Sequence, residues 1–189
     1  MSTTCTDVEV ALVEEILQRV AGDLSMITDR ELVIGTASVS KATQRPAGRG
    51  KVHISFRLGI EQDGRLHHGC ILLPLAEAIS LACFLMMVPD EGVTGKRKMT
   101  TLDETIKDAM LEVGNFIGGA ADAALRDAVG VEAKVRSEGC QGVRAGIRPA
   151  LIYSEGAPLV VGTARATIHE YPEFEMILML PELEGLGGA

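Results

Sequence analysis

The stretch Asp108-Ala-Met-Leu-Glu112-Val-Gly-Asn115-Phe-Ile-Gly118-Gly119 carries the most informative pattern in this chain. If the stretch is helical, Asp108, Glu112 and Asn115 fall at positions i, i+4 and i+7 and therefore share one face. Asn115 is also the only asparagine among the 189 residues. The sequence thus predicts a stripe of two acids and a carboxamide on a helix that is otherwise rich in apolar residues.

A long helix is predicted around this stripe, from Leu102 to about Val129. Its start is indicated by Thr101-Leu-Asp-Glu104, which matches the capping box that satisfies free N–H groups at a helix N-terminus. Gly118 and Gly119 lie inside the helix, where each glycine costs about 1 kcal/mol relative to alanine. Two in a row indicate that another group approaches closely there. The side chains predicted to face the core recur every three or four residues: Ile106, Met110, Val113, Ile117, Ala120 and Ala124.

The remaining elements are predicted from periodicity and turn residues. Strict alternation from Val52 to Ile60 predicts a strand with one buried and one solvent-facing side, and Asp63-Gly64 predicts a hairpin turn after it. The basic run Lys96-Arg97-Lys98 is expected to be a solvated connector, with docking of an acidic partner as the alternative. The full set comprises helices at 7–24 and 74–87, polar loops at 41–50 and 89–101, and strands at 32–39, 52–60, 66–73, 131–135, 146–153, 159–168 and 174–180.

The order of these elements predicts the fold class. The two halves, about 7–88 and 102–181, each begin with a helix that is followed by strands. Helices layered on a largely antiparallel sheet, an α+β fold, are the economical way to bury both kinds of element. The length fits a single domain spanning 1–189, with a core at about 7–181 and a disordered tail at 182–189.

Composition excludes several classes of function. The net charge of −8 argues against nucleic acid as the main partner, because neutralising phosphates requires a basic surface. The longest apolar stretch, Ile71 to Val88, is interrupted and too short in its helical part to span a bilayer, and no secretory signal is seen. We therefore expect a cytoplasmic protein without membrane insertion.

Metal chemistry is not expected either. The four cysteines lie at positions 5, 70, 83 and 140, and no two have the spacing of zinc ligands. The adjacent His67 and His68 are expected at a strand or turn edge. The sequence predicts no metal site and buried, reduced thiols.

The stripe has two interpretations. In the first, the stripe is simply the solvent-exposed polar face that any surface helix requires, and it has no function of its own. In the functional interpretation, the Asn115 carboxamide both donates and accepts hydrogen bonds and can hold a water molecule, while Glu112 and Asp108 pair with a cation of a partner. No histidine, cysteine or serine shares this face within a turn, which disfavours covalent catalysis. Such a face is suited to inserting into the active site of another protein.

The pattern Asp108-x3-Glu112-x2-Asn115 on a long helix, followed by the small residues Gly119, Ala120 and Ala121, resembles the motif of the CheC/CheX/FliY chemotaxis phosphatases. The layout, with one copy on the second long helix, is similar to CheX. CheC-type members carry a second copy on the first helix. Here that helix offers only Glu15 and Gln18, with Ala11 where an acid or serine would stand.

The resemblance implies a CheC/CheX-like pseudo-symmetric αβ domain that hydrolyses the phospho-aspartate of a CheY-like response regulator. By resemblance, Asn115 orients the attacking water, Glu112 pairs with the regulator's lysine, and Asp108 and Gly119 contact the partner. The chain would need no cofactor of its own, since Mg²⁺ would come with the regulator. A homodimer is expected, as in CheX.

One departure from the family pattern concerns a proline that follows the asparagine further along the chain. Glu138 stands at that position here. The alternative function is accordingly a non-catalytic binding module on the same fold, which takes a response regulator or a flagellar or signalling partner without hydrolysing phosphate.

Overall fold

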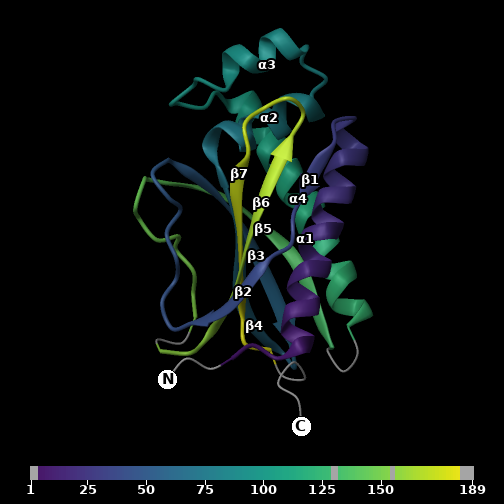
Figure 1. Ribbon diagram of the computed structural model, residues 1–189, viewed down its shortest axis with the longest axis vertical. Coiled ribbons are helices and arrows are strands. Elements are labelled where there is room, and N and C mark those ends of the chain that lie inside the picture. The colour runs from purple at the N-terminus through teal and green to yellow at the C-terminus, as the bar shows by residue number, and fades with distance from the viewer. Residues whose placement is uncertain (1–3, 129–131, 154–155, 184–189) are drawn as a thin grey trace.

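The computed structural model describes residues 4–128, 132–153 and 156–183. A layer of helices lies against one face of a sheet, and two long loops lie against the other face (Figure 1). The first described helix begins, and the last described strand ends, at the same end of the molecule. The predicted domain bounds stay a prediction, and most of the predicted tail, residues 184–189, falls outside the described residues.

The helices are long where a continuous apolar stripe supports them. Thr6 and Glu9 form a reciprocal capping box at the start of the first helix, which runs past its predicted end at residue 24. The next helix directly follows the strand Arg65–Pro74 (β4), as predicted. The described helices are α1 (Asp7–Thr28), α2 (Leu75–Leu85), α3 (Asp90–Lys96) and α4 (Glu104–Asp127).

All strands belong to one antiparallel sheet, which confirms the predicted α+β class. The strands are β1 (Leu32–Ile34), β2 (Ser38–Ala42), β3 (His53–Gln62), β4 (Arg65–Pro74), β5 (Ala133–Val143), β6 (Leu159–Ile168) and β7 (Phe174–Pro181). They are ordered β1-β6-β7-β4-β3-β5, and β2 also pairs with β6. Among the described strands, β5 is therefore an outer strand that pairs with β3 alone.

The strand order contains an approximate two-fold symmetry. Hairpin β3–β4 belongs to the first half of the chain and hairpin β6–β7 to the second, and β4 and β7 meet at the centre. The first strand of each half pairs with the hairpin of the other half, since β1 pairs with β6 and β5 pairs with β3. The same two-fold symmetry relates α1 to α4, which pack against each other.

Both faces of the sheet are covered, and this corrects one prediction. Strand β3 was expected to have a wet side, but eight of its ten residues are buried. The residues of β3 that face the helices join the main core. The opposite face of the sheet holds a second apolar cluster, which includes Leu151 from the loop between β5 and β6. The second cluster consists of Cys70, Leu72, Val143, Leu151, Leu159, Val161, Ile177 and Met179.

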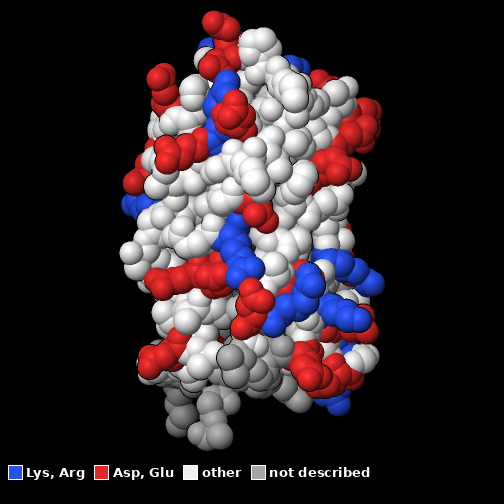
Figure 2. All heavy atoms as spheres, turned by 90° about the vertical axis from the view of Figure 1, so that its right-hand side faces the viewer, with Lys and Arg blue, Asp and Glu red and all other residues white. Residues whose placement is uncertain are grey.

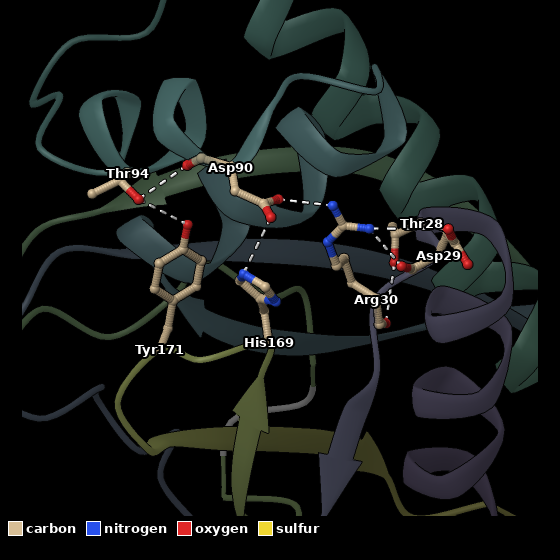
Figure 3. A network of polar contacts seen from close by, with 7 residues as sticks. All are labelled: Thr28, Asp29, Arg30, Asp90, Thr94, His169 and Tyr171. Atoms are coloured by element: carbon tan, nitrogen blue, oxygen red, sulfur yellow. Dashed lines mark hydrogen bonds and ion pairs between the residues drawn. The ribbon is translucent and has the colours of Figure 1, made fainter.

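Segment 89–101 is not the polar loop that the sequence indicated, because it contains helix α3. Asp90 near its start accepts an ion-paired hydrogen bond from Arg30 at 2.8 Å and lies 3.6 Å from Nε2 of His169 (Figure 3). The hydroxyls of Thr94 and Tyr171 are 3.3 Å apart. These contacts tie α3 to the end of α1 and to the turn between β6 and β7.

The basic run at the end of α3 was expected to be a solvated connector. This holds for the exposed Lys98 but is wrong for Arg97. The side chain of Arg97 is only 13% exposed and bonds to Glu77 at 2.7 Å. Its guanidinium also lies 3.8 Å from the ring centroid of Tyr171, within cation–π distance. Arg97 is thus a structural residue that joins α3 to α2 and to the β6–β7 turn.

The strand predictions need three further corrections. Segment 32–39 is split into the separate strands β1 and β2. The strand expected at 131–135 continues to Val143, and residues 129–131 lie outside the described ones. Segment 146–153 is not a strand, because the chain turns at Gly146, whose φ is 73°, and then runs as a loop over the second cluster.

Candidate functional site

Helix α4 carries the stripe, and its position is fixed by its cap and by its apolar face. Asp103 is the N-cap, and its carboxylate accepts a hydrogen bond from the N–H of Ile106 at 2.8 Å. The predicted capping box at Thr101 is therefore wrong by two residues. The apolar residues predicted to face the core are all buried. Each large one stabilises the fold by about 1.5–3 kcal/mol through burial, so α4 is held firmly against β5, α1 and α2.

The predicted stripe lies on the exposed side of α4. Asp108, Glu112, Asn115 and Gly119 are all exposed, while the residues between them include the buried core face. Nδ2 of Asn115 donates a hydrogen bond to Oε2 of Glu112 at 3.3 Å. The structure thus brings the carboxamide and the nearer acid into contact, and this leaves the carbonyl oxygen of Asn115 available to accept from another molecule.

The two acids of the stripe form no ion pair within the described part of the chain. Across the described residues, no Lys or Arg nitrogen lies within ion-pair distance of Asp108 or Glu112. Both carboxylates are therefore free to meet a cation of a partner, with little desolvation cost before binding.

The paired glycines behind the stripe have different environments. A methyl group at Gly118 would lie 2.8 Å from the backbone nitrogen of Ser137 in β5, closer than a Cβ atom can approach. A methyl group at Gly119 would meet nothing within 4 Å. The close approach expected from the glycine pair is therefore the packing of Gly118 against β5. Gly119 instead leaves unoccupied space on the exposed face of α4, one turn after Asn115.

The approximate symmetry gives the stripe an internal counterpart on α1. Aligned from their first residues, Asp7 and Glu104, the two helices place equivalent residues on their exposed faces. Three of the α1 residues, Ala11, Glu15 and Gln18, were considered from the sequence and dismissed as a second copy, and the alignment adds a glycine. The equivalent pairs are Ala11 with Asp108, Glu15 with Glu112, Gln18 with Asn115 and Gly22 with Gly119.

The α1 residues are occupied by contacts within the molecule, in contrast to those of α4. Glu15 forms an ion pair with Arg19 of the next turn. Gln18 donates its side-chain N–H to the carbonyl oxygen of Ile34 at 3.2 Å. Of the two exposed faces, only that of α4 presents an acid and a carboxamide that are not used elsewhere in the described structure.

Glu138 does not belong to the α4 surface. It lies in β5 beside Ser137, whose backbone meets Gly118, and adjacent residues of a strand point to opposite faces of the sheet. Its carboxylate lies 3.1 Å from Nδ1 of His68 and 3.9 Å from Arg57. Glu138 and Gly139 together oppose the single residue Arg57, which forms a β-bulge in β5.

Two apolar residues on α4 were missed by the sequence analysis. Leu111 is 44% exposed and Phe116 is 37% exposed. They flank the stripe, since Leu111 lies one turn before Asn115 and Phe116 directly follows it. Their spacing from the acids of the stripe could have indicated them, because Leu111 lies three residues after Asp108 and Phe116 four residues after Glu112, and residues three or four apart share a helix face. We call Leu111 and Phe116 the apolar shoulders of the stripe, because they place exposed apolar surface beside its polar groups, as protein interfaces do.

Metal and membrane features were searched over the same part of the chain. Among the described residues, no three His, Cys, Asp or Glu side chains are grouped so that they could hold a metal ion. Nor does any helix there combine the length and apolar character needed to cross a membrane.

Neither a protein-family model nor a curated protein sequence matches the chain. Solved structures do resemble it. FliY of Thermotoga maritima has a TM-score of 0.66 at 17% identity, over 97% of this chain and 94% of FliY. A chain of the FliG–FliM complex from H. pylori has a TM-score of 0.65 at 10% identity, over 95% and 94%. CheX of Desulfovibrio desulfuricans has a TM-score of 0.55 at 16% identity, over 89% and 98%.

Proposed function

We propose that this chain, which has the fold of the CheC, CheX and FliY chemotaxis proteins, is a phosphatase for the phospho-aspartate of a CheY-like response regulator. The observation that carries the proposal is the contrast between the two symmetry-related helices. Glu112 and Asn115 are exposed and directed at each other on α4, while Glu15 and Gln18 of α1 are engaged within the molecule.

The chemistry proposed for Asn115 is the positioning of water. With its N–H bonded to Glu112, its carbonyl oxygen accepts a hydrogen bond from a water molecule placed in line with the phosphorus atom. The water oxygen forms the new P–O bond, the acyl-phosphate P–O bond breaks, and the partner's aspartate leaves as a carboxylate. Inorganic phosphate is released and the water's proton goes to phosphate or solvent. Positioning of this kind can account for several kcal/mol of the barrier.

The other residues of the stripe are proposed to hold the partner. Glu112 pairs with the regulator's active-site lysine, and Asp108 adds a second contact. Gly119, without a side chain, lets the partner's backbone approach α4. Mg²⁺ belongs to the regulator in this proposal and has no site on this chain. We further propose that the protein acts in the cytoplasm as a homodimer.

The test is the decay of a phosphorylated CheY-like receiver in the presence of the protein. Asn115→Ala should lower the rate about 10²-fold, as removal of one positioned hydrogen-bonding group does in other enzymes. Gln18→Ala is the matched control, since it removes the equivalent carboxamide of α1 and should leave the rate unchanged. Equal rates for Asn115→Ala and the unmodified protein would show that the assigned role is wrong.

A second function is a binding module without catalysis. Its support is the likeness to a chain of the FliG–FliM complex, together with Glu138 at the position where the family pattern has proline. Such a protein would retain a receiver or a flagellar partner in a pull-down without accelerating phosphate loss. Any acceleration that depends on Asn115 would contradict this alternative.

A further inference from the structure

Beyond the stripe, α4 and the outer strand β5 enclose a hollow of about 380 Å³ at the edge of the sheet. It is lined by residues of α4, β5 and β3, namely Asp122, Arg126, Lys134, Val135, Arg136, Gly59 and Glu61. Asp122 fixes its shape, because Oδ1 of Asp122 accepts a hydrogen bond from the N–H of Val135 at 2.7 Å. The hollow therefore has a rigid wall where the helix is fastened to the strand.

The charged side chains around this hollow include three cations, which we name the cationic edge: Arg126, Lys134 and Arg136. Two of them are paired within the molecule, Arg126 with Asp122 and Arg136 with Glu138, and the acid Glu61 also lines the hollow. The Arg126 and Arg136 side chains are 66% and 65% exposed, and Lys134 is also exposed. Among the described residues no carboxylate lies within ion-pair distance of Lys134. In Figure 2, the largest group of Lys and Arg side chains on the helical side lies at its lower right.

The cationic edge continues the surface of the stripe. Asn115, Gly119, Asp122 and Arg126 recur every three or four residues and so lie on one face of α4. At 1.5 Å per residue, Arg126 is about 16 Å along the axis from Asn115. An interface of standard size buries about 800 Å² per partner, which is wide enough to cover both. Gly119 leaves the surface between them open.

We propose that the cationic edge is the second half of the docking surface and binds an acidic surface of the phosphorylated receiver. This rests on the proposed function in one respect, that the partner is a receiver. A receiver that carries a phosphorylated aspartate is negatively charged around that group, whereas this chain has a net charge of −8 and two free acids on the stripe. Without a local excess of cations, the two proteins would repel each other. The exposed side chains of the cationic edge reduce this repulsion, above all Lys134, which has no acidic partner among the described residues. They raise the association rate more than they alter the chemistry.

The experiment uses the full chain and a CheY-like receiver held in its phosphorylated-like state by beryllofluoride. Arg126→Glu, Lys134→Glu and Arg136→Glu together should raise Kd, and KM for the phosphorylated receiver, about 10-fold or more, while kcat stays within about 3-fold. The affinity of the unmodified protein for the receiver should fall as the salt concentration is raised, and the affinity of the variant should change much less. Arg165→Glu is the matched control, since Arg165 is 68% exposed on β6 and should behave as unmodified protein.

Reversing Arg126 also places an acid beside Asp122, so a second variant keeps Arg126 and changes only Lys134→Gln and Arg136→Gln. This variant should retain the urea midpoint of the unmodified protein and still weaken binding. Unchanged Kd and salt dependence in both variants would overturn the proposal. So would a change of oligomeric state with unchanged receiver binding, because the β5 edge would then be a contact between copies.

The two proposals fail separately. If Asn115→Ala hydrolyses the receiver as fast as the unmodified protein does, the catalytic proposal is wrong, and the beryllofluoride titration still decides the cationic edge. If binding ignores the cationic edge while Asn115→Ala is inactive, only the second proposal is overturned.

Discussion

Oε2 of Glu138 lies 3.1 Å from Nδ1 of His68, on the face of the sheet that points away from α4. The same carboxylate lies 3.3 Å from Arg136 through its other oxygen and 3.9 Å from Arg57. Glu138 thus joins three strands on the face opposite the candidate site. It contributes no side chain to the exposed face of α4.

We predict that Glu138→Gln lowers stability and spares the reaction. The partly buried Arg57 and His68 lose their carboxylate, and leaving such partners unpaired costs about 1–3 kcal/mol. Chemical denaturation should therefore show a lower free energy of unfolding. The rate of receiver dephosphorylation at saturating receiver should be unchanged at a temperature where the variant is folded. A large loss of kcat with normal stability would show that Glu138 acts on the site after all.

The two glycines of α4 should respond to alanine in opposite directions. Gly118→Ala places a methyl group 2.8 Å from the backbone of Ser137, so α4 and β5 must separate, at a cost of about 1–3 kcal/mol. Gly119→Ala meets open space and gains the helix propensity of alanine, about 1 kcal/mol. Urea unfolding of the two variants provides the comparison, with each serving as the control of the other.

Gly119→Ala also tests the partner contact assigned to that residue. If the receiver's backbone approaches α4 there, the added methyl group should raise KM even though the variant is more stable than the unmodified protein. A more stable variant with an unaltered KM would remove Gly119 from the interface.

The exposed stripe of α4 could be predicted from the sequence because helical periodicity is local. Asp108, Glu112 and Asn115 share a face in any α-helix, and the apolar residues on the opposite side of the helix must then face the core. The packing of Gly118 on Ser137 and the internal contacts of Glu15 and Gln18 could not be predicted, since they depend on segments that meet only after folding.

Strand β5 and helix α3 show where local patterns fail. In β5 the bulge at Glu138 and Gly139 breaks the alternation, and the pairing partner β3 is distant in sequence. In α3 a single buried residue, Val93, leaves no apolar stripe to detect, and the helix is held by polar contacts such as Arg30 with Asp90. The wet face expected for β3 was wrong for a similar reason, because residues outside the strand lie against it: Gly48 meets His53, and the Glu138 side chain meets Gly59.

The attachment of α3 should weaken in acid. The hydrogen bond from Arg30 holds the pKa of Asp90 below its ordinary value, and the charge of His169 acts in the same direction. The stabilisation is thus present above the unfolded-state pKa, about 3.9, and is lost as the pH falls through the lower folded-state value. Amides of α3 such as those of Val93 and Thr94 should therefore lose protection, measured relative to their intrinsic exchange rate, below about pH 4.

Asp90→Asn provides the control for this pH effect. The variant should show faster exchange of the α3 amides already at neutral pH, and its exchange should change little on acidification beyond the intrinsic dependence. Amides of α4 should be unaffected in both proteins. Equal protection of α3 in the variant and the unmodified protein at neutral pH would show that other contacts, such as Arg97 with Glu77, hold α3 alone.

The symmetry between α1 and α4 makes the minimal requirements of the proposed site testable. Ala11→Asp and Gln18→Asn would complete the stripe on α1 around the existing Glu15, and Arg19→Ala would release Glu15 from its ion pair. In an Asn115→Ala background, these three changes should raise receiver dephosphorylation about 10-fold above that background, a small part of what one positioned group contributes.

Omitting Arg19→Ala from this set is the informative control. Glu15 then stays paired with Arg19, and Arg19 also stays bonded to Asp127 of α4 at 2.6 Å, so the gain should disappear. If the complete set, folded as judged by urea unfolding, gives no gain at all, two acids and a carboxamide at this spacing are insufficient. The apolar shoulders Leu111 and Phe116 would then be the first residues to transfer, because they border Asn115 on α4, whereas the equivalent positions on α1 hold Glu14 and Arg19.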